Sequence, residues 1–245
     1  MKIIFLSDAH LRGGHDKDEA SLVRFLDSQS SLSALVVLGD LFDFWTEFAS
    51  RHHVYDLYPH YQGVLSALIR LKKKGTRIIY LEGNHDFSMG GFFTGTLGAS
   101  VYPLSAGIEF DDKLFYLSHG DTIAMTTGYR LWRRFLRSVF FRTLIRIIPP
   151  RHVIGIAGAL SKKSRAYSEK SAGAAVVEEN LKKSAKALLK DGFDVVIFGH
   201  SHSPGIYTAP SQKGLGTYAN PGSWAKEGNY LLWNDGRLSV EKFSG

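Results

Sequence analysis

Strand-like, mostly apolar runs recur along this chain, and residues able to bind a metal stand directly after them. The runs and the residues that follow them are 3–6 with Asp8 and His10, 34–38 with Asp40, 77–82 with Asn84, and 195–198 with His200 and His202. Side chains two residues apart in a strand point to the same side, so each Asp-x-His or His-x-His pair can reach one ion. Ligand sites in open α/β sheets lie outside the carboxyl ends of the strands. The pattern therefore predicts an α/β fold with a metal site at that edge of a sheet.

Each motif has an ordinary structural explanation when it is taken alone. A single Asp-x-His is more often a surface turn than a metal site, and a lone His119 beside Asp121 would most often be a loop histidine. Glycine flanks most of the motifs, which permits sharp turns and a close backbone approach to an ion. It is hard to explain by coincidence that all of these motifs occur in one chain in this order, each after a predicted strand. We therefore expect a site for two metal ions.

This motif order resembles that of the calcineurin-like metallophosphoesterase superfamily, which runs D-x-H, G-D-x-x-D, G-N-H-D, H and G-H-x-H. The resemblance implies a four-layer α/β/β/α sandwich, which agrees with strand and helix alternation followed by hairpins near the carboxyl terminus. The implied ligands of one ion are Asp8, His10, Asp40 and His202, and those of the other are Asp40, Asn84, His119 and His200. Asp40 would bridge the two ions.

This donor set indicates the chemistry that the two ions would support. Two cations roughly 3.5–4 Å apart can clamp a phosphoryl oxygen and acidify a shared water molecule for in-line attack on phosphorus. Mixed Asp, Asn and His donors suit borderline ions more than calcium. We expect two divalent metal ions, with Mn²⁺ as the first choice and Fe, Co or Zn as the others.

His85 stands between the predicted ligand Asn84 and the carboxylate of Asp86. The resemblance implies that His85 is not a ligand but a catalytic residue that steadies the transition state or protonates the leaving oxygen, as an imidazole can near neutral pH. A histidine that only positions substrate is the alternative. We also assign Asp43 and Asp86 to the catalytic group, because metal-binding and catalytic histidines usually lean on a carboxylate.

Length and composition limit what surrounds the site. A chain of 245 residues can bury one large core, and 22% charged residues argue against disorder. The lack of cysteine removes disulfides and thiol catalysis from consideration. The apolar run 3–6 is too short for a signal peptide, and no apolar run is long enough to cross a bilayer. We therefore expect a cytoplasmic protein.

The net charge of +7 is concentrated in one segment. Residues 129–190 contain fifteen Lys or Arg and three Glu, a balance of +12, so the rest of the chain is net acidic. The segment lies between His119 and the strand that leads to His200. We assign residues 1–121 and 192–245 to a metallophosphoesterase core and residues 122–191 to an inserted helical cap.

The first predicted cap helix, 129–148, combines large apolar residues with arginines at helical spacing. Basic amphipathic helices bind membrane surfaces or anions. Packing of the apolar side on a neighbouring helix, with solvated arginines, is the alternative. A second, long cap helix is expected to end near Gly192. The cap residues that we expect to contact an acylated, anionic substrate are Arg130, Trp132, Arg133, Arg134, Phe135 and Arg137.

The stretch Gly-Asp-Leu-Phe-Asp-x-Trp at 39–45, together with the insertion before Gly-His-Ser-His, resembles UDP-2,3-diacylglucosamine hydrolases. Those enzymes split the pyrophosphate of a UDP-linked diacyl sugar into UMP and a lipid-linked sugar phosphate. The resemblance implies a nucleotide-linked lipid substrate, which Asn84 and Trp45 would contact in addition to the cap. It also implies peripheral association of the basic cap with the inner membrane.

Three alternatives to this function are open. Members of that family tend to carry Arg where His85 stands, so a related enzyme could act on another nucleotide-linked or membrane-derived phosphodiester. A nuclease would also use two metals and a basic surface, but the basic segment is rich in aliphatic residues and Phe, so we expect no nucleic-acid partner. A non-catalytic scaffold would have lost ligands or His85, and all are present.

Overall fold

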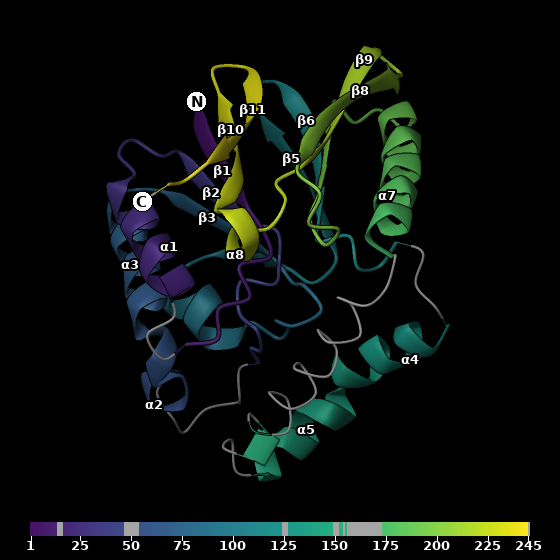
Figure 1. The fold of residues 1–245 in the computed structure, drawn as a ribbon. Helices are drawn as coiled ribbons and strands as arrows, with labels where there is room; N and C mark the ends of the chain where they lie inside the picture. The colour runs from purple at the N-terminus through teal and green to yellow at the C-terminus, as the bar shows by residue number, and fades with distance from the viewer. Residues whose placement is uncertain are drawn as a thin grey trace.

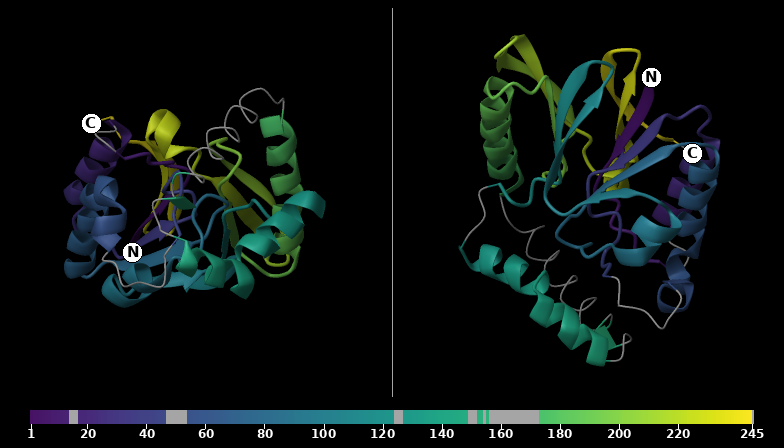
Figure 2. Two further views of the ribbon diagram at one scale, coloured as in Figure 1. Left: turned by 90° about the horizontal axis from the view of Figure 1, so that it is seen from below. Right: turned by 180° about the vertical axis from the view of Figure 1, so that it is seen from behind.

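The computed structural model describes residues 1–13, 17–46, 54–123, 127–148, 152–153, 155 and 173–244. Within them two β-sheets face each other, and helices cover their outer faces (Figure 1). Two further helices lie below the ends of the strands, apart from both sheets (Figures 1 and 2).

The first sheet contains the amino-terminal strand and most of the parallel pairs. Its strands are β1 Lys2–Leu6, β2 Ala34–Val37, β3 Arg77–Leu81, β4 Ser100–Tyr102, β10 Asn229–Asn234 and β11 Arg237–Lys242. Their order across the sheet is β11-β10-β1-β2-β3-β4. Strands β1 to β4 are parallel, whereas β10 pairs antiparallel with β1 and with β11. The parallel strands therefore end at one edge, where Asp8, Asp40 and Asn84 follow them.

The second sheet has five strands. They are β5 Ser105–Phe110, β6 Lys113–Ser118, β7 Val195–Phe198, β8 Gly205–Ser211 and β9 Gly214–Asn220, in the order β5-β6-β7-β9-β8. Strands β6, β7 and β9 are parallel, while β5 and β8 pair antiparallel at the two sides. His119 follows β6 and His200 follows β7 soon after it ends.

Apolar side chains on both faces of the strands hold the layers together. Along β1, Ile3 and Phe5 belong to the core between the sheets, whereas Ile4 and Leu6 belong to the core under the helices. All four are buried, as expected of a parallel strand covered on both faces. The rings of Phe5 and Phe115 stack with centroids 5.9 Å apart and join the two sheets.

Helices form the outer layers. Helices α1 (Lys17–Ser28) and α3 (Gln62–Lys73) pack together on the first sheet, and α7 (Gly173–Lys190) covers the second. Shorter helical segments are α2 Val54–Leu57, the 3₁₀ helix η1 Pro59–Tyr61, the π-helix η2 Phe92–Thr96 and α8 Trp224–Glu227. The predicted four-layer α/β/β/α sandwich is confirmed.

Helix α7 belongs to this sandwich rather than to the cap. Its Leu181, Ala185 and Leu189 recur every four residues and are buried in one cluster with Phe198 of β7. We expected this helix within the cap segment 122–191, so the predicted boundary is wrong at its carboxyl end. A four-residue apolar spacing shows which helix face is buried, but it does not reveal which surface covers that face.

The cap helices are α4 (Thr127–Leu136) and α5 (Val139–Ile147), which lie below the strand ends in Figure 1. The sequence predicted one helix over 129–148, and the structure has two. Ser138 interrupts the helix because its backbone is extended, with φ −71° and ψ 154°, and its side chain accepts a hydrogen bond from the Phe141 amide. Serine is favoured at such N-cap positions, where it provides an acceptor for an otherwise unpaired amide.

Trp45 is part of an aromatic cluster next to the loop that follows β2. Its indole stacks on Tyr58 and Phe42, with centroids 4.4 and 4.7 Å away, and meets Phe93 edge-on at 5.4 Å. The side chain is 0% exposed, so the expected contact with substrate is wrong. The Trp45 amide instead donates a 3.0 Å hydrogen bond to the carbonyl oxygen of His85, which joins the loops after β2 and β3.

Replacing Trp45 with Ala should lower the free energy of unfolding by about 3–5 kcal/mol, because neighbouring side chains only partly fill the cavity that a buried aromatic residue leaves. Urea unfolding followed by circular dichroism measures this change. Trp132→Ala is a matched control, since this tryptophan is 48% exposed on α4. The control should change the free energy by no more than about 0.5 kcal/mol. Equal losses in the two variants would contradict the assignment of Trp45 to the core.

Candidate active site

The predicted metal ligands meet at the carboxyl edges of the two sheets. Asp8 and His10 follow β1, Asp40 follows β2, Asn84 follows β3, His119 follows β6, and His200 and His202 follow β7. Among the described residues, the groups able to hold an ion are Asp8, His10 and His202; His10, Asp40 and His85; and Asp8, Asp40 and His119. In each group the donor atoms lie within 4.8 Å of one another. Asp8, His10 and Asp40 each belong to two groups, so the groups form one continuous site.

The chain turns sharply at the residues that follow the strands. Five of the seven predicted ligands have a positive φ angle: Asp8 (54°), His10 (43°), Asp40 (53°), His200 (66°) and His202 (57°). Residues other than glycine seldom adopt this left-handed conformation, which costs roughly 1–3 kcal/mol each. Strain of this kind gathers at functional sites, so its concentration at one edge supports the choice of this edge.

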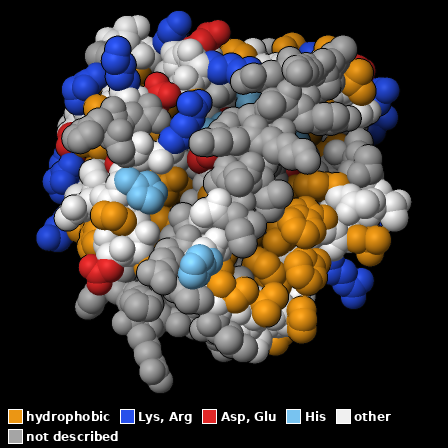
Figure 3. All heavy atoms as spheres, turned by 60° about the horizontal axis from the view of Figure 1, so that its bottom comes forward, with side chains coloured by type: hydrophobic (Ala, Val, Ile, Leu, Met, Phe, Trp, Pro, Cys, Tyr) orange, Lys and Arg blue, Asp and Glu red, His pale blue; other side chains and the backbone are white. Residues whose placement is uncertain are grey.

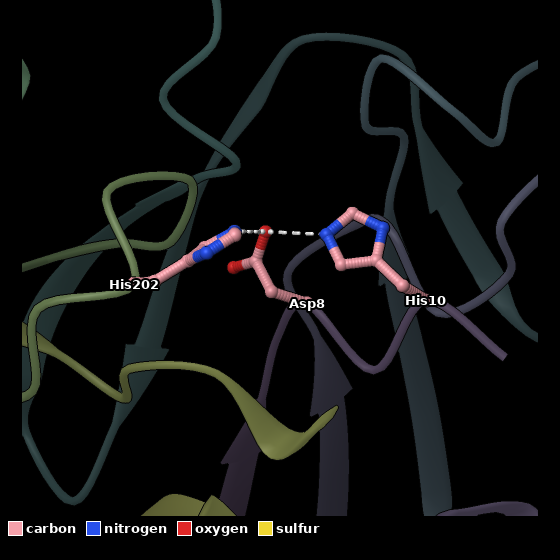
Figure 4. A group of neighbouring side chains, drawn as sticks. All are labelled: Asp8, His10 and His202. Carbon is pink, nitrogen blue, oxygen red and sulfur yellow. Dashed lines mark hydrogen bonds and ion pairs between the residues drawn. The ribbon is translucent and has the colours of Figure 1, made fainter. Parts of the chain in front are cut away.

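The carboxylate of Asp8 lies between His10 and His202, with one imidazole on each side (Figure 4). Its Oδ1 is 3.1 Å from His202 Nε2 and 3.7 Å from His10 Nε2. Its Oδ2 accepts hydrogen bonds from Ser7 Oγ and, at 3.0 Å, from the amide of His200. Burial opposes a charge on Asp8, but His202 and other nearby histidines hold its pKa below the usual range. Asp8 is therefore a negatively charged oxygen donor near neutral pH.

A second set of donors surrounds Asp40 and His119. His119 Nε2 lies 3.1 Å from Asn84 Oδ1 and 3.4 Å from Asp40 Oδ2. His119 Nδ1 is 2.7 Å from the carbonyl oxygen of Leu38, so this nitrogen carries a proton. The other ring nitrogen, Nε2, faces the metal-donor oxygens of Asn84 and Asp40. The ring of His200 stands beside it with centroids 5.0 Å apart. The structure thus brings together the four residues expected to hold one ion.

Burial and neighbouring charges set the protonation of the remaining groups. Burial lowers the pKa of His10 and that of His200 to about 4, so both imidazoles are neutral near pH 7 and can donate a lone pair. Burial opposes a charge on Asp40, but His119 holds the pKa of that carboxyl well below its ordinary value. His10 Nδ1 is buried, and no described residue forms a hydrogen bond with it. Charged carboxylates beside neutral imidazoles and an unpartnered ring nitrogen fit a divalent cation.

Two glycines allow the loops after β2 and β3 to touch. A Cβ atom on Gly83 would collide with the carboxylate of Asp40, and one on Gly39 would lie 2.8 Å from the Cα atom of Gly83. Gly39 also has a φ of +82°, which other residues rarely adopt. A side chain at either position would push the loops apart. Close approach of the loops that carry Asp40 and Asn84 therefore requires both glycines.

The carboxylate of Asp86 ties the same two loops together. It accepts hydrogen bonds from the amides of Asp40 (3.0 Å), Leu41 (2.7 Å) and Gly83 (2.9 Å), and from the hydroxyl of Tyr80. Burial and the nearby charge of Asp40 raise the pKa of Asp86 to about 6. We expected this carboxylate to orient groups that bind the metal. Its hydrogen bonds hold the backbone of the loop that carries Asp40.

His85 lies beside the donors, and two contacts set its orientation. Its amide donates to Asp40 Oδ1 at 2.9 Å, and its ring Nδ1 lies 2.9 Å from the main-chain oxygen of Asp43. The ring is edge-on to His10, with centroids 5.1 Å apart. A carbonyl oxygen can only accept, so it keeps a proton on Nδ1. The contact with Asp43 is made by its main-chain oxygen, so the role expected of the Asp43 carboxylate stays a prediction.

One predicted substrate-binding arginine docks the cap helices on the core. Arg133 is buried, and its guanidinium donates to Asp121 Oδ2 and to the carbonyl oxygen of Pro103, both at 3.0 Å. The hydroxyl of Tyr129 donates to the same oxygen of Asp121 at 2.8 Å. These protein groups hold Arg133 in place, and its expected contact with substrate stays a prediction. Tyr129 and Arg133 are four residues apart and share a helix face, which is the face that meets the core.

Arg137 reaches the loop after β3 from the end of α4. Its Nη2 donates to the carbonyl oxygen of Gly83 at 2.7 Å, and its guanidinium lies 5.2 Å from the centre of the Phe87 ring. Its Nε is 3.5 Å from a carboxylate oxygen of Glu82. Arg137 therefore stands next to Asn84 but is held by protein groups. The other predicted cap residues, Arg130, Trp132, Arg134 and Phe135, are exposed.

Residues that the sequence did not assign to the site support its Asp8 side. Ser223 Oγ donates a 2.8 Å hydrogen bond to the carbonyl oxygen of Asp8. The amide of Trp224 donates a 3.1 Å hydrogen bond to the carbonyl oxygen of Ser7. Residues 220–223 form a turn after β9. Asn220 is its first residue, and its Nδ2 donates a 3.0 Å hydrogen bond to the carbonyl oxygen of Gly199. The Asn-Pro-Gly-Ser stretch was the available signal, but a turn sequence does not reveal which loop it will contact.

Comparisons with known proteins agree with this geometry. The family model of the calcineurin-like phosphoesterases matches residues 1–204. A UDP-2,3-diacylglucosamine hydrolase of Ralstonia nicotianae is 29% identical, with 98% of this chain and 91% of that protein covered. The protein of the same name from Porphyromonas gingivalis is 28% identical over 98% and 97% of the two chains, and that of Proteus mirabilis 26% over 99% of each.

A solved structure shares the fold. The structure of a novel archaeal phosphodiesterase matches with a TM-score of 0.50 and 14% sequence identity, covering 99% of this chain and 100% of its own. The family model spans most of the chain and includes all seven predicted ligands. The chain therefore belongs to the calcineurin-like phosphoesterase family.

Proposed function

We propose that this chain is a two-metal hydrolase that splits the pyrophosphate of UDP-2,3-diacylglucosamine and releases UMP and 2,3-diacylglucosamine 1-phosphate. One observation carries the proposal. A continuous cluster of metal donors lies at the sheet edge of a chain that is similar, over nearly its full length, to UDP-2,3-diacylglucosamine hydrolases. Cleavage of a pyrophosphate needs cations to neutralise its charge and an acid near the leaving oxygen. The carboxylates and histidines of the site are suited to both tasks.

The donor set supports two divalent ions, and we propose Mn²⁺ as the native metal. The proposed ligands are Asp8, His10, Asp40 and His202 for one ion, and Asp40, Asn84, His119 and His200 for the other. When bound, such ions polarise phosphoryl oxygens and lower the pKa of a shared water molecule. Carboxylate, amide and imidazole donors together suit Mn²⁺ and similar borderline ions.

His85 is the proposed catalytic residue of the chain itself. Hydrogen bonds from its amide to Asp40 and between its Nδ1 and the Asp43 carbonyl fix the ring beside the donors. An imidazole held in this way can donate a proton to the leaving phosphate oxygen or a hydrogen bond to the negative charge that develops there. Asp86 contributes indirectly, since it holds the loops that carry Asp40 and His85.

The outward side of the cap helices supports a role at a membrane surface. Its exposed apolar residues are Leu131, Trp132, Phe135, Val139, Phe140 and Leu144. Figure 3 shows hydrophobic side chains gathered on the side of the molecule that lies at the bottom of Figure 1. Arg130 and Arg134 are exposed on the same helices. Apolar patches with flanking cations favour a surface of anionic lipid, so we propose peripheral membrane association through this face.

We further propose that the acyl chains of the substrate contact Trp132 and Phe135. Their rings stack with centroids 5.7 Å apart on the exposed side of α4. A pair of exposed aromatic rings offers apolar area that a lipid chain can cover. Among the described helices, none has the length and apolar character to cross a membrane.

The substrate assignment predicts the products and the effect of the acyl chains. The Mn²⁺-loaded protein should release UMP from UDP-2,3-diacylglucosamine, and removal of both acyl chains should slow the reaction about tenfold or more, because remote apolar contacts then no longer help to bind the transition state. Chromatographic measurement of UMP tests this. Faster hydrolysis of a generic phosphodiester or of single-stranded DNA than of the lipid substrate would contradict the assignment.

Replacing His85 with Ala should slow hydrolysis by roughly 10²–10⁴-fold, the range typical of a general acid. Elemental analysis of the purified variant should find the parental Mn²⁺ content, because the proposed ligands are intact. An unchanged rate would remove His85 from catalysis. Loss of Mn²⁺ would instead make His85 a ligand, since it lies in one of the donor groups.

The membrane proposal predicts that the apolar face of the cap controls binding to vesicles. Replacing Trp132 and Phe140 together with Ser should weaken sedimentation with phosphatidylglycerol vesicles about tenfold or more, because two large side chains no longer enter the lipid interface. Leu215→Ser is a matched control, since this leucine is 79% exposed on β9, far from the cap. Equal binding by the two variants would contradict a role of this face.

A further inference from the structure

Glu178 of α7 is a buried carboxylate beside the apolar face that packs on the second sheet, and its Oε1 lies 3.9 Å from Nζ of Lys182. Glu178 is 6% exposed and precedes the buried Leu181 by one turn. Its Oε2 accepts a 2.6 Å hydrogen bond from Ser201 Oγ and a 3.2 Å hydrogen bond from the hydroxyl of Tyr218. Burial raises the pKa of Glu178, and these two hydrogen bonds oppose the shift. A buried carboxylate costs free energy unless it is hydrogen-bonded. Among the described residues its hydrogen bonds are made through Oε2, and the buried Oε1 accepts none.

Ser201 is the residue between the predicted ligands His200 and His202. Its hydroxyl accepts a 2.9 Å hydrogen bond from Asn220 Nδ2, so its single proton is directed to Glu178. The Nδ2 group of Asn220 also donates to the carbonyl oxygen of Gly199, at the start of the turn. The His-Ser-His turn is therefore held by α7 through Glu178 and by β9 through Asn220.

This turn needs restraint because its backbone is strained. His200 and His202 both have left-handed φ angles, which residues other than glycine keep only when their surroundings enforce them. Their rings also have different partners: His202 Nε2 meets Asp8 at 3.1 Å, while the His200 ring stands beside that of His119. A small rotation of the turn would move both imidazoles away from these partners.

We propose that Glu178 is a positioning residue of the metal site, which fixes the directions of His200 and His202 by accepting the hydrogen bond of Ser201. Among the described residues, the side chain of Glu178 interacts with Ser201, Tyr218 and Lys182 rather than with the two histidines. The proposal rests on the two-metal site proposed above and extends it beyond the seven ligands and His85 to the outer helix of the second sheet. A contact that served only to attach α7 would change the stability of the protein but leave metal affinity unaltered.

Titration with Mn²⁺, followed by the electron paramagnetic resonance signal of the free ion, tests the proposal independently of turnover. Glu178→Ala should weaken Mn²⁺ binding by roughly 10–100-fold, as is typical when a group that orients a ligand is lost. Glu178→Gln should stay within about threefold of the parent, because an amide oxygen can accept the same hydrogen bond. Glu179→Ala is the matched control on the same helix, and it should not alter affinity because Glu179 is exposed.

Ser201→Ala removes the other partner by deleting a single hydroxyl, and it should reproduce the weaker Mn²⁺ binding even if Glu178→Ala fails to fold. Urea unfolding of the metal-free variants separates loss of stability from loss of affinity. Parental affinity in folded Glu178→Ala or in folded Ser201→Ala would overturn the positioning role. Failure of the parent protein to bind Mn²⁺ would overturn the two-metal function itself, so the two failures are distinguishable.

Discussion

The buried carboxylate of Asp86 is the interaction on which the rest of the site depends. It accepts amide hydrogens from the loops after β2 and β3 and so places Asp40 next to Asn84. The loops can approach this closely only because Gly39 and Gly83 carry no side chain. Burial and repulsion from the nearby charge of Asp40 raise the pKa of Asp86. Neighbouring histidines, and in our proposal two cations, offset that repulsion.

Both sheets are needed to assemble the donors. Asp8, Asp40 and Asn84 come from the first sheet, whereas His119 and His200 come from the second. The apolar core between the sheets fixes the position of one sheet edge relative to the other. The outer layer contributes too, since a carboxylate of α7 reaches through to the turn that carries the last two histidines. The geometry of the site therefore depends on how the layers pack. A shift of one sheet relative to the other would separate the metal donors of the first sheet from those of the second.

Helix α4 reverses the usual arrangement of an amphipathic helix on a protein core, whereas Phe141 of α5 packs against the core. Tyr129 and Arg133 of α4, and Arg137 just after it, contact the core, while Trp132 is exposed. A helix that only covered a core would bury its apolar side. The reversed pattern supports the proposal that lipid, rather than protein, covers the outward face. In this arrangement Arg133 and Arg137, two arginines of the basic segment, attach the cap to the core.

The fold class and the placement of the donors at one sheet edge could be predicted from the sequence alone. Parallel strands must end at a common edge, so residues that follow them are brought together whatever the remaining detail. Which arginines meet the core could be learned only from the packed chain, because helical periodicity shows which residues share a face but not what that face contacts. The same reason explains the placement of α7. The error at Trp45 has another cause, because burial of this loop residue depends on aromatic side chains that other segments bring to it. The contact between Glu178 and Ser201 joins a helix to a strand-end turn, and its existence depends on how the helix is seated on the sheet.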